Sequence, residues 1–258
     1  MKNTSCVLIL SCDKYADLWY PFFEIFWKNW PDCPIPVYLG SNTISYKDIR
    51  VKTILSGKDE NWSSSYKKIL NQIPEKYIFV WVEDGFVIRK VNTNKVVMIF
   101  DFMERNNANH IHFRPLPKPD NLIDINFGAY HKCTPYRVNL VGFWRKKYLL
   151  KLLLDGENGW DFEIMGSYRS SYDEGFYCLN YILFDYIHAI EKGKWLPEAS
   201  NYCKAYGYKI DKNNREFITR LMIIKSKLKS IYFDFMMKTN SRFRVKTMDL
   251  LRKLLVSY

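Results

Sequence analysis

The stretch that decides the fold is Tyr77-Ile-Phe-Val-Trp-Val-Glu-Asp-Gly-Phe86. Its first six residues form an uninterrupted apolar run, which is typical of a strand buried on both faces of a sheet. The run then ends in two carboxylates and a glycine, so the strand passes directly into a polar turn. The stretch predicts a central strand whose carboxyl end carries acidic side chains.

Strands and helices alternate along the chain on both sides of this strand. Short apolar runs predict strands over residues 7–10, 37–39, 51–55, 77–82, 110–113 and 138–144. Helical spacing predicts helices over 18–30, 62–73, 93–104 and 147–154, the second of them capped by Asn61. Three prolines open a long irregular connection from residue 115 to about residue 136. The alternation predicts an α/β fold with helices on both faces of the sheet.

The positive charge of the chain is concentrated at its C-terminal end. The whole chain of 258 residues has a formal net charge of +12, and residues 204–258 alone hold 14 basic and 4 acidic side chains. Apolar residues in this tail recur three or four positions apart, at Phe217, Leu221, Ile224, Leu228, Ile231 and Phe235. We therefore expect one domain over residues 1–203 and a basic amphipathic helical tail over 204–258. Such a helix can lie on an anionic membrane or pack on the domain, and the sequence leaves both open.

Several classes of protein are excluded or disfavoured. The longest apolar run has six residues, well short of the roughly 20 needed to span a bilayer. The apolar run at residues 6–10 is too short for a secretory leader, so we expect a cytoplasmic protein. The six cysteines form no CxxC pair, which indicates neither a disulfide framework nor a structural zinc site. The P-loop, GxGxxG and GxSxG motifs are absent from the sequence.

The acidic pair Glu83-Asp84 is the first candidate site. Ligands of open α/β sheets bind at the carboxyl ends of strands, and two adjacent carboxylates there can hold a divalent cation that bridges phosphate oxygens. Residues 11–13 end a neighbouring strand. The alternative is that Glu83-Asp84-Gly85 is simply a polar turn.

A second acidic site lies in Gly159-Trp160-Asp161-Phe162-Glu163. The aromatic neighbours could remove water from one carboxylate, raise its pKa and make it a general base toward a hydroxyl. The alternative is that Asp161 and Glu163 only favour the N-terminus of a helix.

The order of these motifs resembles that of bacterial GT-A-type glycosyltransferases of surface-polysaccharide synthesis, such as those that build capsule or O-antigen. The resemblance covers roughly residues 5–200 and rests on the stretches 7–13, 62–70, 77–86, 142–145 and 160–163. It implies a GT-A-like, Rossmann-like mixed sheet flanked by helices and a nucleotide-sugar as donor. In that case Ser11, Cys12 and Asp13 line the nucleotide site. Glu83 and Asp84 take the Asp-X-Asp role and bind Mn²⁺ or Mg²⁺, and Glu163 is the base, with Asp161 as second candidate.

The predicted function is transfer of a sugar from a nucleotide-sugar to a glycan or polyprenyl-linked acceptor, with inversion at the anomeric carbon. The tail would give peripheral contact with the membrane. Because Glu-Asp-Gly departs from Asp-X-Asp, metal dependence is open, and so is a protein that binds a sugar nucleotide or a glycan without turnover. A nucleic-acid-binding protein is a weaker alternative, since the basic charge is separated from the aromatic residues. We therefore expect no nucleic-acid partner.

Overall fold

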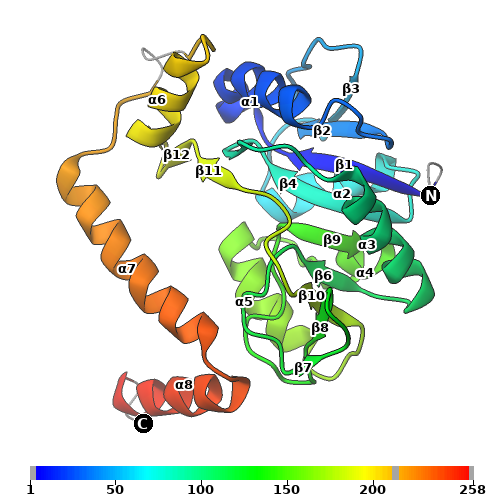
Figure 1. Cartoon of the computed structure of the whole chain (residues 1–258), viewed down its shortest axis with the longest axis vertical. Helices are drawn as coiled ribbons and strands as arrows, with labels where there is room; N and C mark the ends of the chain where they lie inside the picture. The colour runs from blue at the N-terminus through cyan, green and yellow to red at the C-terminus, as the bar shows by residue number, and fades with distance from the viewer. Residues whose placement is uncertain (1–3, 211–214, 256–258) are drawn as a thin grey trace.

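The computed structural model describes residues 4–210 and 215–255. A mixed sheet of nine strands runs through the body in the order β3-β2-β1-β4-β9-β6-β10-β8-β7 (Figure 1). Its strands are β1 (Ser5–Leu10), β2 (Val37–Ser41), β3 (Val51–Leu55), β4 (Tyr77–Val82), β6 (His110–His112), β7 (Asn121–Leu122), β8 (Phe127–Ala129), β9 (Gly142–Arg145) and β10 (Phe176–Leu179). The first four strands in this order are parallel, and β9 is antiparallel to both of its neighbours, β4 and β6.

Helices cover both faces of the sheet. They are α1 (Ala16–Asn29), α2 (Trp62–Gln72), α3 (Thr93–Arg105), α4 (Lys146–Leu152), α5 (Gly159–Arg169) and α6 (Pro197–Ala205), and a short 3-10 helix, η1 (Asp13–Tyr15), precedes α1. Successive side chains of β1 enter different cores because a strand alternates its faces. Val7 and Ile9 pack with α1 and α3, whereas Cys6 and Leu8 pack with α2 and α4. The predicted α/β fold with a two-sided sheet is confirmed.

Two short ribbons lie beside the main sheet. β5 (Gly85–Val87) pairs antiparallel with β11 (Tyr186–His188), and β12 (Ile190–Glu191) pairs antiparallel with β13 (Lys194–Trp195). β5 begins directly after the acidic pair, so the ribbon fixes the direction in which the chain leaves β4.

The strand predicted over residues 138–144 begins only at Gly142. In the segment before it, side chains take the place of a strand partner. The Ser167 hydroxyl accepts from the Val138 N–H at 3.1 Å, and the Glu163 carboxylate accepts from the Leu140 N–H at 2.9 Å. The connection predicted to be irregular over 115–136 contains β7 and β8, which form one end of the sheet. Neither difference is visible in the apolar pattern, because side chains of α5 hold the segment before β9 and β8 pairs with the distant β10.

The tail forms two helices, α7 (Arg220–Lys238) and α8 (Ser241–Leu255), where the sequence predicts one. The expected boundary at residue 203 falls inside α6. Beyond α6, the described chain contacts the body at Ile218, whose N–H donates to the Trp195 carbonyl, and again at Met237, whose carbonyl accepts from the Lys118 N–H. Figure 1 shows α7 running alongside the body between α6 and α8. Among residues 4–210 and 215–255, no helix has both the length and the apolar character to cross a membrane.

Gly85 is required by the packing of Trp81, and we predict that Gly85→Ala destabilises the fold. A Cβ at Gly85 would lie 2.8 Å from the Trp81 Nε1, which donates to the Gly85 carbonyl at 2.7 Å. The indole cannot move away, because Phe113, Phe184 and Tyr186 pack edge-on against it. We expect a loss of about 1–3 kcal/mol in urea unfolding.

Gly159→Ala is the matched control for that substitution. Its Cβ would meet its nearest neighbour, Trp62, at 3.6 Å, which is ordinary contact, and it lies in the first turn of α5. Alanine favours a helix over glycine, so stability should be unchanged or slightly higher. Equal unfolding midpoints for Gly85→Ala and the wild type would contradict the packing account.

Candidate functional site

The carboxyl ends of β1, β4 and β6 lie on one edge of the sheet, because the three strands point the same way. β9 runs the opposite way and therefore begins at this edge, where Gly142 pairs with Val80. The edge thus gathers residues 11–13 after β1, 83–84 after β4, 114 after β6 and 139–141 before β9. We call it the carboxyl edge. It brings together segments that are up to about 130 residues apart in sequence.

Glu83 is a buried carboxyl at the carboxyl edge, only 6% exposed. Burial and the charge of Asp84 raise its pKa to about 8, while a hydrogen bond with Ser11 and the charge of Arg215 act in the opposite direction. Ser11 is itself tied in place, because its hydroxyl oxygen accepts from Trp19 Nε1 at 2.8 Å. Glu83 therefore lies in contact with the end of β1, as the sequence predicted for neighbouring strand ends.

Asp84 is half-buried next to Glu83. Burial raises its pKa, and the charge of His188 lowers it. The β5–β11 ribbon brings His188 opposite Gly85, and the Asp84 carbonyl accepts from the Ala189 N–H at 2.6 Å. No sequence pattern connects His188 with the acidic pair, because the two are about a hundred residues apart and β11 is only three residues long.

The acidic pair has the chemistry of a divalent-cation site. The pKa values of Glu83 and Asp84 are both raised. The protein therefore stabilises the ionised forms of these two carboxyls only in part. Carboxylate oxygens are the ligands that Mg²⁺ and Mn²⁺ prefer, and Mg²⁺ is commonly held by one or two carboxylates together with substrate phosphates. Within the described part of the chain, no group of three or more His, Cys, Asp or Glu side chains is arranged around a common metal position. Glu83 and Asp84 could therefore hold a divalent cation only together with ligands that come from outside the described residues.

Asp13, which we expected to line the nucleotide site, binds the loop after β2. Its oxygens accept from the backbone N–H groups of residues 42, 43 and 44, and from the Thr43 hydroxyl at 2.5 Å. Burial alone would raise the pKa of Asp13, but these hydrogen bonds outweigh it and lower the pKa. Asp13 therefore holds the loop after β2 against the loop after β1, and it shapes the wall of the carboxyl edge.

Cys12 lies between Ser11 and Asp13 and is half-buried. Burial and the charge of Glu83 raise the pKa of its thiol. A thiol whose pKa is raised stays protonated near neutral pH and is a poor nucleophile. Cys12 is thus suited to packing or hydrogen bonding against a ligand and not to covalent chemistry.

The structure separates the two carboxylates of the second acidic site. Asp161 is exposed and forms a capping box: the Asn158 side chain accepts from the Asp161 N–H at 3.0 Å, and the Asp161 carboxylate faces the Asn158 N–H at 3.5 Å. Trp160, which the sequence suggested as a shield for these carboxylates, is exposed. Asp161 therefore has the structural role that the sequence offered as the alternative.

Glu163 lies on the opposite side of α5 from this cap and reaches the carboxyl edge. Its Oε1 accepts from the Leu140 N–H at 2.9 Å, in the segment that leads into β9. The residue as a whole is half-buried, but its carboxyl group is enclosed, and this burial raises the pKa of Glu163 to about 7. The hydrogen bond from the Leu140 N–H and the charge of Arg114 act in the opposite direction. Arg114 follows β6, so the charge that acts on Glu163 also belongs to the carboxyl edge.

Arg215 is a charged residue of this region that the sequence did not indicate. Its guanidinium pairs with the Asp17 carboxylate through two hydrogen bonds, of 2.7 and 2.9 Å, and also donates to the Lys14 carbonyl in η1. Both side chains of the pair are buried. Arg215 follows a segment outside the described residues, in the region 204–258 that we predicted to be a tail. Its place beside η1 is therefore apparent only in the folded chain.

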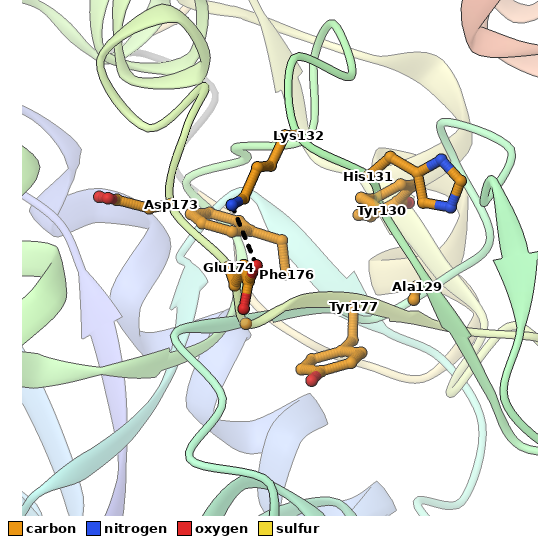
Figure 2. A pocket seen from close by; sticks show the side chains of 9 residues that line it. Ala129, Tyr130, His131, Lys132, Asp173, Glu174, Phe176 and Tyr177 are labelled. Atoms are coloured by element: carbon orange, nitrogen blue, oxygen red, sulfur yellow. Dashed lines mark ion pairs between the residues drawn. The ribbon is translucent and has the colours of Figure 1, made fainter.

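A cavity of about 520 Å³ lies away from these residues (Figure 2). It is formed by residues 129–132 and 173–177, at the edge where β10 begins and β8 ends. Lys132 Nζ and Glu174 Oε1 form an ion pair of 3.0 Å within it (Figure 2). The cavity is therefore at the edge of the sheet opposite the carboxyl edge, and it contains none of the candidate residues.

Comparison with protein-family models and with curated proteins finds no match for this chain. One similar solved structure is Staphylococcus aureus TarS 1–349 in complex with UDP-GlcNAc, with a TM-score of 0.43 and 11% identity, covering 68% of this chain and 58% of that one. CMP-2-keto-3-deoxy-manno-octonic acid synthetase complexed with CTP and 4-diphosphocytidyl-2C-methyl-D-erythritol synthase each have a TM-score of 0.44 and 10% identity, over 79% of this chain and 98% and 99% of theirs. The chain spans less than two thirds of the TarS structure. These similarities assign no activity to it.

We predict that Glu163→Gln stabilises the protein at alkaline pH. The folded pKa of about 7 lies above the ordinary value of 4.5, so the unfolded chain ionises first and stability is lost as pH rises through that interval. Glutamine keeps an acceptor for the Leu140 N–H without the charge. The variant should match the wild type near pH 4.5 and exceed it by roughly 2–3 kcal/mol at pH 8.5 in urea unfolding.

Asp161→Asn is the matched control, two residues away on the same helix. It alters an exposed capping contact, so it should cost less than about 1 kcal/mol and by the same amount at both pH values. If Glu163→Gln showed no gain at alkaline pH, the carboxyl of Glu163 would have to be well solvated.

Arg215→Met should destabilise the protein by about 3–5 kcal/mol, because it leaves the buried Asp17 carboxylate without its partner. The double variant Arg215→Met/Asp17→Leu removes that unpaired charge and should recover part of the loss. Urea unfolding of the wild type and the two variants measures both effects. A loss below about 1 kcal/mol in the single variant would mean that the pair is exposed to water.

Proposed function

We propose that the chain is a glycosyltransferase that moves a sugar from a nucleotide-sugar donor to a hydroxyl of a glycan or polyprenyl-linked acceptor, in the assembly of a bacterial surface polysaccharide such as capsule or O-antigen. One observation carries the proposal: two separate acidic groups, the pair Glu83-Asp84 and Glu163, lie on the same edge of the sheet with pKa values of about 8 for Glu83 and about 7 for Glu163. The sequence resemblance described above supports it independently. With a polyprenyl-linked acceptor, the enzyme would work at the inner face of the cytoplasmic membrane.

The donor site in this proposal lies between the ends of β1 and β4. Departure of a nucleoside diphosphate leaves negative charge on its phosphates, which must be stabilised. Glu83 and Asp84 would hold Mg²⁺ or Mn²⁺ against the diphosphate, and a bound cation supplies that stabilisation. Ser11 and Cys12 would contact the nucleotide, while Asp13 keeps the two flanking loops together.

The acceptor site in this proposal lies at Glu163. A carboxyl with a pKa of about 7 is substantially ionised at neutral pH and is basic enough to take a proton from a hydroxyl as it attacks. The Leu140 N–H binds one of its oxygens and so orients the group. A single displacement, in which the base-activated hydroxyl attacks the face opposite the leaving diphosphate, inverts the anomeric carbon. Two separate acidic positions suit this reaction, because base and leaving group act on opposite sides of the sugar.

A protein that binds a sugar nucleotide or a glycan without turnover is the second candidate. The observation that favours it is the sequence Glu83-Asp84-Gly85, in which the two carboxylates are adjacent and not one residue apart. Donor binding without release of nucleotide would identify this case.

The first test is the thermal stability of the whole chain with UDP-, GDP-, CMP- and dTDP-sugars, each with and without Mg²⁺ or Mn²⁺. A ligand that binds only the folded state raises the unfolding temperature. We expect a shift with the sugars of one nucleotide that is larger in the presence of metal. Glu163→Gln should then reduce release of nucleotide from that donor by about a hundredfold or more while leaving the donor-induced shift intact.

Glu174→Gln serves as control for the turnover assay, because it makes the same chemical change at the opposite edge of the sheet. It should release nucleotide at the wild-type rate. Full activity of Glu163→Gln would remove Glu163 as the base, and absence of any donor-induced shift would contradict the proposal that a nucleotide-sugar binds to the free protein.

A further inference from the structure

Helix α7 has a row of large apolar side chains that are turned to the solvent. Its members are Leu221, Ile224, Ile231 and Phe235, which are 63%, 56%, 66% and 60% exposed. Their spacings of three, seven and four residues place them on one side of a helix with 3.6 residues per turn. Met236 and Met237, on other sides of the same helix, are buried. The contact of α7 with the body therefore does not cover this row, which we call the α7 stripe.

Positively charged side chains border the α7 stripe. At 3.6 residues per turn, Arg220, Lys227 and Lys238 fall along one margin of it, and all three are exposed. Asp234 is the only acidic residue in α7. An apolar face bordered by Lys and Arg is the pattern of helices that lie in the interface of a membrane, with the apolar side chains at the acyl boundary and the cations near phosphates.

The α7 stripe is held in a fixed direction, because the chain is anchored at both ends of the helix. Before α7, Arg215 is bound to Asp17 and to η1. In its last turn, the Met237 carbonyl accepts from the Lys118 N–H at 2.8 Å and from the buried Arg244 side chain at 3.2 Å. Figure 1 shows α7 between α6 and α8, separate from the helices that cover the sheet. The exposure of the stripe is thus built into the fold.

We infer that the α7 stripe docks on the surface of an anionic lipid bilayer. Charge decides between the possible occupants. A second copy of the chain would bring its own basic tail, with 14 basic and 4 acidic side chains over 204–258, against the same charges. A layer of anionic headgroups instead complements the cations, and each Lys or Arg near such a surface adds to the attraction. A helix of 19 residues is about 28 Å long, enough for a two-sided contact with headgroups and acyl chains.

This docking deepens the proposed function and can be tested apart from it. It would keep the enzyme at the surface where a polyprenyl-linked acceptor resides, but lipid binding requires no sugar chemistry. Failure of lipid binding would leave the donor assays unaffected, and failure of those assays would leave lipid binding unaffected.

The experiment is sedimentation of the full chain with vesicles of phosphatidylcholine alone, and with vesicles that contain about one third phosphatidylglycerol. We expect binding only to the anionic vesicles, weakened by added salt. Ile231→Ser/Phe235→Ser should reduce binding at least about tenfold by removing apolar area from the stripe. Arg220→Glu/Lys227→Glu should reduce it to a similar degree by reversing charge.

The control is Ile49→Ser/Tyr172→Ser, which removes two exposed apolar side chains from the body and should bind like the wild type. All replaced side chains are exposed, so unfolding temperatures should stay at the wild-type value. If one stripe variant does not fold, the other decides the question. The inference is overturned if the chain ignores anionic vesicles, if the stripe variants bind as well as the wild type, or if the wild type forms a dimer that the stripe variants cannot form.

Discussion

The position of β9 between β4 and β6 is the constraint on which the carboxyl edge depends. Phe143 of β9 stacks on Phe79 of β4 at 4.5 Å and meets Phe100 of α3 edge-on, so the strand is fixed in the core. Because β9 begins where its neighbours end, the segment before it crosses the same edge. That segment offers the Leu140 N–H to Glu163, and a parallel strand at this place would have carried it to the other side of the molecule.

At the carboxyl edge, burial raises the pKa of Glu83 and Glu163, whereas nearby arginine side chains lower it. Glu83 and Glu163 would each be more easily accommodated as neutral side chains, and their raised pKa values show that the fold gives the ionised forms incomplete compensation. Arg215 and Arg114 offset only part of this cost. Carboxyls kept in such surroundings are common at sites that bind or transfer charge, where a ligand supplies what the protein lacks.

The sequence patterns predicted the elements that depend on residues close together in the chain. Apolar runs located β1 and β4, and Asn61 does cap α2 by accepting from the Ser64 N–H. The acidic pair was found for the same reason, since it directly follows β4. The resemblance ranked Glu163 before Asp161 as the base, but no local pattern distinguishes the cap from the buried carboxyl, because that difference depends on Leu140. The Arg215–Asp17 pair and the approach of His188 to Asp84 also have no local signal, and the chemical roles of these residues stay predictions.

Asp17 pairs with Arg215, which lies 198 positions later in the chain, so this pair can form only late in synthesis. A domain generally folds as a unit, so α1 and the first strands become stable together with the strands that follow them. The loop at η1 cannot reach its final state until Arg215 has left the ribosome, after the nine strands of the main sheet. Ser11 and Glu83 thus acquire their final electrostatic surroundings last. The loops around the carboxyl edge therefore reach their final arrangement only when residues as far apart as Asp17 and Arg215 are both present.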